Sequence, residues 1–412
     1  MQRTRNRVQP NLAIAVLLIA LSATAPMSID MFLPSLPSMT EDFGARDATM
    51  QLAVTLFLVA FAGSQIVWGQ ASDRLGRRPM MFAGLGMFIV GGVVALLSSS
   101  AEVLIAARVL QGFGGGAGPT LARAMVLDIY GREGAARFIA HMSIVLPLAP
   151  AISPIVGGFL HDAFDWHAVF VVLIAVGVLL FAAYAVLLPE TRPERLETNR
   201  RVRDDYRLLL SSSTFVGYSF VMGLMFAGQL VFISMSSFVL IDQLGLAPQV
   251  FGLAFAVVAL GLMAGATLSS RLVAKMEPRR IVLLGALVSA ASSGTMTALS
   301  WAGAEHPATV VAPMFFTAFG LGVTRPSAMA GALVGFPQIA GLASALMGFS
   351  QMALSTGYNI VYSQLFAPGV TSLSSGVFVA VLSALVVLLV LRPGRVEALP
   401  ASEPGLEAQP AG

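Results

Sequence analysis

Long apolar segments recur along the whole chain, and they limit what this sequence can fold into. Each is about 20 residues long, the length that an α-helix needs to cross a bilayer. Hydrophobic residues make up 57% of the 412 residues and charged residues only 11%, whereas soluble proteins carry about 25% charged residues. The segments lack the alternation of polar and apolar residues that marks barrel strands. The sequence therefore predicts an all-α integral membrane protein with twelve transmembrane helices at 12–33, 49–71, 80–98, 103–127, 137–160, 166–188, 214–240, 249–271, 280–300, 308–333, 339–366 and 369–391.

Basic residues fall on alternate connections between these segments. If both termini lie on one side, all but four of the 24 Lys and Arg residues face that side or lie in the termini, the exceptions being Arg46, Arg108, Arg123 and Arg325. Loops rich in Lys and Arg stay in the cytoplasm, so we expect both termini to be cytoplasmic. The net charge of +3 then reflects topology and attraction to anionic lipid, and nucleic acid is not an expected partner.

The N-terminus allows a second interpretation. Early arginines, an apolar run and Ala23-Thr24-Ala25 imitate a secretory signal with its cleavage site. However, Pro26 would follow the cut, and cleavage would leave eleven spans with an unbalanced topology. We therefore expect the first segment to be retained as helix 1.

A short charged loop at residues 69–80 separates the second and third apolar segments. Asp73 and Arg77 are four residues apart and can face each other on one side of a helix, while Gly69 and Gly76 permit a sharp bend. An ordinary positive-inside turn would explain the arginines but neither the aspartate nor the glycine spacing. The pattern G-x-x-x-D-R-x-G-R-R resembles the loop between helices 2 and 3 of the major facilitator superfamily of secondary transporters. Its residues here are Gly69, Asp73, Arg74, Gly76, Arg77 and Arg78.

This resemblance implies two pseudo-symmetric bundles of six helices with a cavity between them at the membrane midplane. The only long polar connection lies between the sixth and seventh segments. We therefore expect an N-terminal bundle at 1–188, a cytoplasmic linker at 189–213 and a C-terminal bundle at 214–391. The remaining segment, 392–412, is rich in Pro, Ala, Glu and Gly and is predicted to be disordered.

Two ionisable residues stand out inside predicted spans, where such a residue is costly unless it is paired or faces a cavity. Asp30 lies near the outer end of helix 1, and Arg108 lies six residues after Glu102 in helix 4. At 1.5 Å per residue both fall about 6–9 Å inside the same face of the bilayer. The matched depth permits a direct pair or a shared water pocket. Alternatively, each side chain snorkels outward or only stiffens the bundle.

Motifs of the N-terminal half narrow the resemblance to the Bcr/CflA-type drug exporters. Residues 28–34 (SIDMFLP) are similar to the helix 1 motif of that family, and residues 108–114 (RVLQGFG) match R-x-x-Q-G-x-G of helix 4, whose arginine is implicated in proton coupling. Residues 166–170 (WHAVF) resemble the W-R-x-x-F start of helix 6, with His167 replacing arginine. The C-terminal half matches only in layout.

Helix 5 carries a pattern that resembles the antiporter motif ending in P-x-x-G-G. It opens at Pro150 and ends with Pro154, Gly157 and Gly158. Ser153 departs from the family, because many exporters have glycine at that position.

The resemblance implies a proton-driven antiporter that exports small amphipathic drugs, such as phenicols, from the bacterial cytoplasm across the inner membrane. Asp30 would carry the proton, and Arg108 would stabilise its ionised form in one conformation and release it in another. Asp73 and Arg77 would form a charge network with Asp128 that latches one conformation. The alternatives are a proton-coupled symporter or exporter of a small metabolite and, with less support, a channel or a receptor.

The expected partners are a small-molecule drug, protons and the lipid bilayer, with the protein acting as a monomer. No nucleophile–base or metal-ligand constellation suggests an enzyme, a cofactor or a metal site. The histidines and aspartates at 161–167 fit a capped outer loop better than a metal site, and the glycine-rich run 112–118 fits close helix packing better than a dinucleotide loop.

Polar and aromatic stripes mark the helices that could line a substrate cavity. The residues that we expect to line it are Met27, Gln111, Met222, Met225, Gln229, Gln351, Tyr358 and Asn359. Such stripes also bind helices to one another, so lining and packing both remain open for them.

Overall fold

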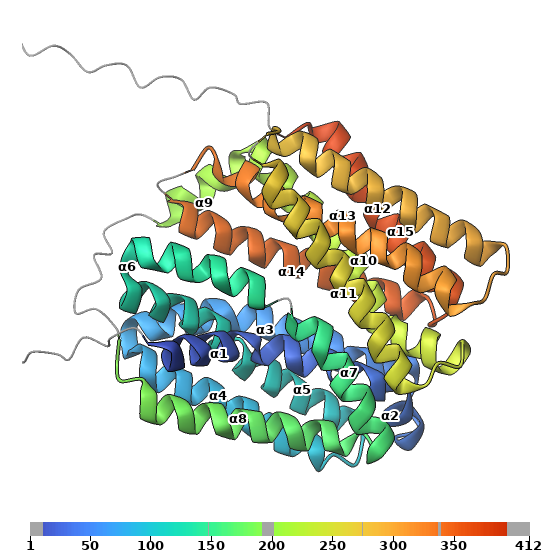
Figure 1. The fold of residues 1–412 in the computed structure, drawn as a ribbon, viewed down its shortest axis with the longest axis horizontal. Helices are drawn as coiled ribbons and strands as arrows, with labels where there is room; N and C mark the ends of the chain where they lie inside the picture. The colour runs from blue at the N-terminus through green and yellow to red at the C-terminus, as the bar shows by residue number, and fades with distance from the viewer. Residues whose placement is uncertain (1–10, 147, 192–201, 274, 337–338, 394–412) are drawn as a thin grey trace, which may run out of the picture.

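The computed structural model describes residues 11–393 apart from 147, 192–201, 274 and 337–338 (Figure 1). Within these residues the regular structure is helical. The N-terminal half contains α1 (Leu12–Asp30), the 3₁₀ turn η1 (Leu33–Ser35), α2 (Leu36–Asp42), α3 (Asp47–Leu75), α4 (Arg77–Leu96), α5 (Ala101–Gly115), α6 (Ala117–Val145), α7 (Leu148–Ala163) and α8 (His167–Leu187). After α9 (Val202–Ser211), the C-terminal half contains α10 (Ser213–Ser237), the π-helical turn η2 (Phe238–Gln243), α11 (Pro248–Leu272), α12 (Pro278–Trp301), α13 (Pro307–Leu333), α14 (Ala340–Leu365) and α15 (Val370–Leu391).

Two bundles of six spans make up the fold, in agreement with the sequence. Nine helical stretches in the described part of the chain are long and apolar enough to cross a membrane by themselves. The other three spans are the predicted fourth and fifth, which use α5, α6 and α7, and the eleventh, which is α14. In Figure 1 the two bundles lie one above the other, with α9 at one end.

The first span is broken beside Asp30, which the prediction of one helix over 12–33 missed. Helix α1 ends at Asp30. Because proline has no N–H, Pro34 cannot donate to the carbonyl of Asp30 four residues earlier. The chain tightens instead, and the Phe32 N–H donates to the Ile29 carbonyl at 3.2 Å. The break leaves Asp30 at the end of a helix inside the bundle.

The fourth and fifth spans have boundaries other than those predicted. Element α6 (Ala117–Val145) consists of two helical parts that meet at Gly131, where φ is 67°, and it covers residues that the sequence assigned to a loop. Glycine adopts that conformation readily, so the chain reverses there without a long connection. The two predicted spans are therefore each built from a short helix and one part of α6.

The linker between the halves is partly helical. The sequence placed a polar connection at 189–213, but α9 occupies Val202–Ser211 and packs against α10. Residues 192–201 and most of the predicted disordered tail, 394–412, lie outside the described residues. The domain boundaries stay predictions.

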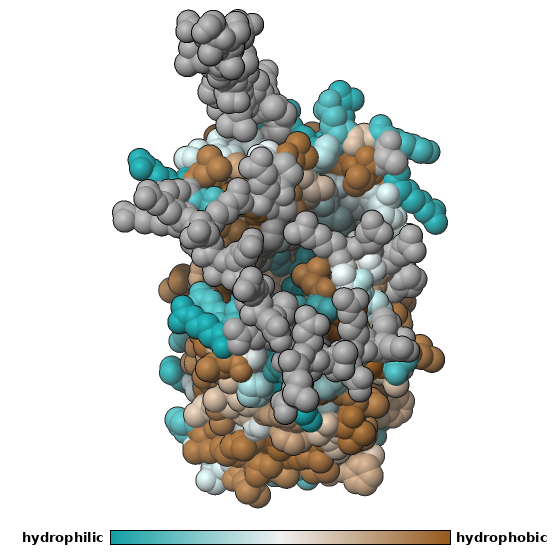
Figure 2. Space-filling view, turned by 90° about the vertical axis from the view of Figure 1, so that its left-hand side faces the viewer, coloured by the Kyte–Doolittle hydropathy of each residue, from teal (hydrophilic) through white to brown (hydrophobic). Residues whose placement is uncertain are grey.

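We call the end that carries Arg77, Arg78, Arg279 and Arg280 the basic end, and the other the far end. At the far end the halves are hydrogen-bonded to each other. Asn359 Nδ2 of α14 donates to Thr55 Oγ1 of α3 at 3.0 Å, and the Gln249 side chain of α11 donates to Asp162 of α7. The basic end is viewed directly in Figure 2, which shows hydrophilic side chains set back near its middle.

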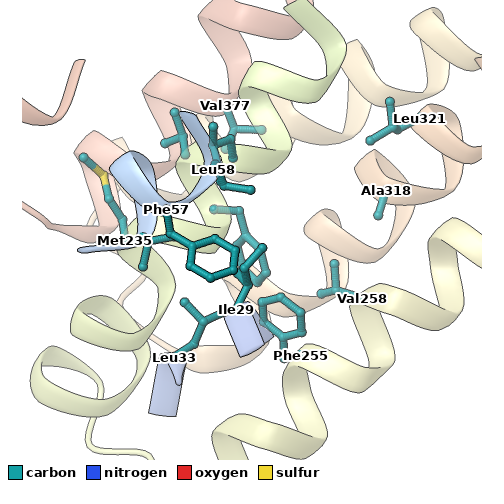
Figure 3. Packing of buried hydrophobic residues seen from close by; sticks show 14 of the residues in the cluster. Ile29, Leu33, Phe57, Leu58, Met235, Phe255, Val258, Ala318, Leu321 and Val377 are labelled. Atoms are coloured by element: carbon teal, nitrogen blue, oxygen red, sulfur yellow. The ribbon is translucent and has the colours of Figure 1, made fainter. Parts of the chain in front are cut away.

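Apolar packing also differs between the far end and the basic end. One cluster of buried side chains includes residues of both halves, among them Ile29 and Phe57 from the first and Phe255 from the second (Figure 3). A second cluster, built around Leu18, Trp68 and Met125, draws only on helices of the N-terminal half towards the basic end. Among the described residues, the halves thus share buried apolar packing towards the far end.

Glycines bring α7 and α11 into backbone contact between the halves. A Cβ added to Gly158 would lie 2.3 Å from the Pro248 carbonyl oxygen, and one added to Gly252 would lie 2.5 Å from the Pro154 carbonyl oxygen. Both distances are shorter than any real contact, so only glycine permits this approach.

We expect Gly252→Ala to lower the melting temperature of the purified protein in detergent, because overpacking against backbone costs about 1–3 kcal/mol. The matched control is Gly63→Ala in α3, where an added Cβ meets nothing within 4 Å. There alanine should stabilise the helix by about 0.5–1 kcal/mol. Equal melting temperatures for the two variants would contradict the close α7–α11 contact.

Candidate functional site

The Arg108 side chain of α5 is fully buried at the meeting point of α1, α3 and α5. Its Nη1 donates to Ser28 Oγ at 2.8 Å and to Gln111 Oε1 at 2.6 Å, and its Nη2 donates to the Ser28 carbonyl at 3.1 Å. The guanidinium also lies over the rings of Phe32 and Phe57, 4.4 and 4.3 Å from their centroids. These contacts offset the free-energy cost of removing the guanidinium cation from water.

Asp30 lies two residues beyond Ser28, at the break after α1. The residue is 5% exposed. Within the described residues its carboxylate has no hydrogen-bond partner and no cation within 4.0 Å. The structure therefore brings Asp30 and Arg108 into one region of the protein without a direct ion pair. Of the two arrangements that the matched depth permits, direct pairing is absent from this conformation.

The glycine pair of α7 reaches the same break. A Cβ on Gly157 would lie 2.1 Å from the Met31 carbonyl oxygen, immediately after Asp30. Pro154 lies inside α7 and Pro150 in its first turn, where the missing N–H costs little. The antiporter-like residues therefore place one edge of α7 against the chain beside Asp30 and, through Gly158, against the other half.

The loop at the basic end contains a compact charge network. Arg77 Nη1 contacts Asp73 Oδ1 at 2.5 Å and donates to Ser72 Oγ at 2.7 Å, while Arg77 Nε contacts Asp128 Oδ2 at 3.2 Å. Burial raises the pKa of the Asp128 carboxyl, and the adjacent Arg77 opposes that shift. The structure thus brings together the three residues from which we expected a latch. Their role in gating stays a prediction.

Glu190 is part of this network, although the sequence pattern did not predict it. Its carboxylate accepts the backbone N–H groups of Arg77 and Arg78, at 2.9 and 3.1 Å, at the start of α4. A carboxylate is favourable there because the first N–H groups of a helix have no partner within it. Gly76 makes room, since its φ is 105° and a Cβ would lie 2.6 Å from Glu190 Oε2. The signal available in the sequence was an acid directly after the sixth span.

The remaining motif residues have more peripheral positions. Arg78 Nη2 donates to the Ala185 carbonyl of α8 at 2.9 Å. Arg74 lies in the last turn of α3, and Gly69 lies 3.8 Å from Thr120 of α6, measured from an added Cβ.

The residues expected to line a cavity fall into different environments. Met222 and Met225 are buried in the apolar cluster shared by both halves. Tyr358 Oη donates to the Gly376 carbonyl of α15, and the amide of Asn359 joins Ser234 of α10 to Thr55 of α3. Gln111 Nε2 and Gln229 Oε1 are buried and have no hydrogen-bond partner among the described residues, Gln351 is buried and Met27 is partly exposed. Packing thus accounts for Met222, Met225 and Tyr358, and Gln111 and Gln229 retain unused polar atoms.

Comparison with known proteins identifies a family. The model of the Major Facilitator Superfamily matches residues 17–358. The chain is 32% identical over 69% of its length to an uncharacterised MFS-type transporter of Bacillus subtilis, covering 73% of that protein. It is 30% identical over 78% of its length to a bicyclomycin resistance protein homolog of Haemophilus influenzae, covering 81% of it. It is also 30% identical over 80% of its length to a chloramphenicol resistance protein of Pseudomonas aeruginosa, covering 79% of it.

Among solved structures, a D-xylose–proton symporter has the same fold. It superposes with a TM-score of 0.74 over 90% of this chain and 96% of the symporter, at 16% sequence identity. Identity at that level supports the fold and carries no information about the substrate.

We expect Glu190→Ala to speed hydrogen exchange at the Arg77 and Arg78 amides, because their acceptor is lost. A missing helix cap costs about 0.5–2 kcal/mol, which makes local opening of the first turn of α4 more frequent. Exchange is read by mass spectrometry on a peptide covering 76–80. Glu190→Gln keeps one acceptor oxygen and should have a smaller effect. Unchanged exchange in Glu190→Ala would show that the carboxylate does not hold this turn.

Proposed function

This chain belongs to the major facilitator superfamily, and from that premise we propose that it is a proton-coupled antiporter that exports small amphipathic drugs, phenicols among them, from the cytoplasm. The same proposal places it as a monomer in the bacterial inner membrane with both termini in the cytoplasm. The named resistance relatives support the substrate class, and the antiporter-like residues of α7 support the direction of transport. The observation that carries the proposal is the state of Asp30.

Asp30 is a buried carboxyl group without a partner among the described residues. An ionised carboxylate in that position would be unfavourable by several kcal/mol, so this conformation favours the neutral, protonated form. A conformation that admits water or brings Arg108 closer would favour the ionised form. A carboxyl group that changes its environment between two conformations can take up a proton on one side of a membrane and release it on the other.

Alternating access supplies the two conformations. The shared apolar core and the hydrogen bonds from Asn359 and Gln249 hold the halves together at the far end. The basic end would then be the open side, and a drug would enter from the cytoplasm. We propose that the Asp73–Arg77–Asp128 network stabilises one of the two conformations, since a contact made in only one state shifts the population by its differential free energy.

We expect Asp30→Asn to abolish export driven by a pH gradient while leaving drug binding largely intact, because asparagine keeps the shape of the side chain but cannot release a proton. Inverted membrane vesicles with an imposed gradient provide the assay, with proton movement followed by a pH-sensitive dye when chloramphenicol is added. An antiporter releases protons from the vesicle lumen under these conditions, whereas a symporter moves protons and substrate in the same direction.

The matched control is Asp165→Asn, which removes a carboxylate from the exposed turn before α8. It should transport at the wild-type rate. Gradient-driven transport by Asp30→Asn at the wild-type rate would remove Asp30 as the coupling residue.

We expect Arg108→Lys to retain partial transport at best. Lysine keeps the positive charge but loses the planar fork that donates to Ser28 and Gln111 and stacks on two rings. Arg108→Ala should be inactive. Drug binding measured across a pH series should titrate differently in Arg108→Ala and the wild type. Identical titration curves would mean that Arg108 does not influence Asp30 and has only a packing role.

A further inference from the structure

Two arginines inside predicted spans have no part in the network described above. Arg123 lies on α6 in the N-terminal half, and Arg325 lies on α13 in the C-terminal half. Each is eight residues from the basic end of its span, taken as Gly131 for α6 and Leu333 for α13. At 1.5 Å per residue both lie about 10–12 Å inside that end. An arginine at such depth is costly and usually faces a water-filled cavity or a functional partner.

Neither arginine has an acidic partner in the described part of the chain, where no carboxylate lies within 4.0 Å of either one. The two cations are instead close enough to interact electrostatically with each other across the boundary between the halves. Like charges in a medium of reduced dielectric repel. A protein keeps such a pair without a counter-ion where an anion from outside supplies the missing charge.

Both side chains reach solvent and yet are closely surrounded by protein atoms, which is the combination expected of residues that line a recess. Arg325 lies nine residues from the exposed Phe316, which is two and a half turns of α13, so the two side chains leave opposite faces of the helix. Phe316 is apolar and exposed, so its face of α13 is the one that faces lipid. Arg325, on the opposite face, therefore points towards the interior of the bundle. In Figure 2 hydrophilic side chains are visible between the grey atoms near the middle of this end of the molecule.

We propose that Arg123 and Arg325 together bind the anionic group of a small-molecule solute in the recess at the basic end. Guanidinium groups match carboxylate, sulfonate and phosphate oxygens through paired hydrogen bonds. This inference rests on the proposed export function and narrows its substrate class to amphipathic compounds that include anions. Closing the basic end brings the two halves, and with them the two cations, closer together. A bound anion offsets their repulsion, so it favours closure.

Binding to the purified full-length protein tests this site without transport. Isothermal titration in a neutral detergent compares 2-naphthalenesulfonate with the neutral 2-naphthalenemethanol, which has the same ring. Arg123→Gln and Arg325→Gln should each weaken sulfonate binding by about 10-fold or more, the loss expected for a hydrogen bond to a charged group. Binding of the alcohol should change less than about twofold, as expected where no charged contact is lost.

Arg271→Gln serves as the control, because it removes an exposed arginine at the basic end of α11 and should leave sulfonate affinity unchanged. The proposal would be overturned if Arg123→Gln and Arg325→Gln weakened binding of the sulfonate and of the alcohol equally. It would also be overturned if both variants kept the wild-type affinity for the sulfonate. A parallel titration in phosphatidylcholine nanodiscs with and without phosphatidylglycerol separates the two sources of an anionic group. Sulfonate binding that phosphatidylglycerol abolishes would assign the arginines to a lipid headgroup and overturn the proposal of a solute.

Because the assay reads binding alone, its outcome is independent of the export function. Sulfonate binding that depends on both arginines, found together with no gradient-driven drug transport, would support the site and refute the proposed function. Active drug transport, found together with anion binding that does not depend on the arginines, would support the proposed function and refute the site.

Discussion

Burial of the Arg108 cation organises the N-terminal half around it. A guanidinium removed from water needs hydrogen bonds to its charge, each contributing about 1.5–3 kcal/mol, and the fold supplies them from Ser28 of α1 and Gln111 of α5. Two aromatic faces, Phe32 and Phe57, enclose the cation, and a desolvated cation–π contact adds about 2 kcal/mol. Three helices are thereby held at fixed positions, and Asp30 is carried to the end of α1 beside them.

The position of Asp30 follows from that arrangement and from one proline. Pro34 ends α1 at Asp30, and Gly157 lets α7 contact the chain at the next residue. Since α7 also packs against α11 through Gly158 and Gly252, any relative motion of the two halves shifts the surroundings of Asp30. The coupling of proton movement to access is therefore proposed to run through backbone contacts that only glycine permits.

Much of the fold followed from the sequence, because apolar length and arginine placement are strong constraints in a membrane. Twelve spans and two bundles were predicted. Asp73 and Arg77 of the basic loop were paired from their spacing, and Asp128 was joined to them through the family resemblance. The break after α1 was not predicted, since Pro34 interrupts the first span without interrupting its apolar pattern. Glu190, Thr55 and the rings around Arg108 were also missed, because they act through residues distant in sequence. The absence of a direct Asp30–Arg108 contact depends on conformation, which depth along two helices cannot specify.

The distance between the halves at the basic end, measured against pH, tests the central claim most directly. The chain has no cysteine, so spin labels can be attached at Val186→Cys and Ser270→Cys, both exposed near that end. If the conformation open at the basic end holds Asp30 protonated, the label distance is long in acid and shortens as the pH rises. With Asp30→Asn the distance should stay long at every pH. An Asp30→Asn protein whose label distance shortens with pH as the wild type does would contradict the claim that Asp30 couples protonation to access.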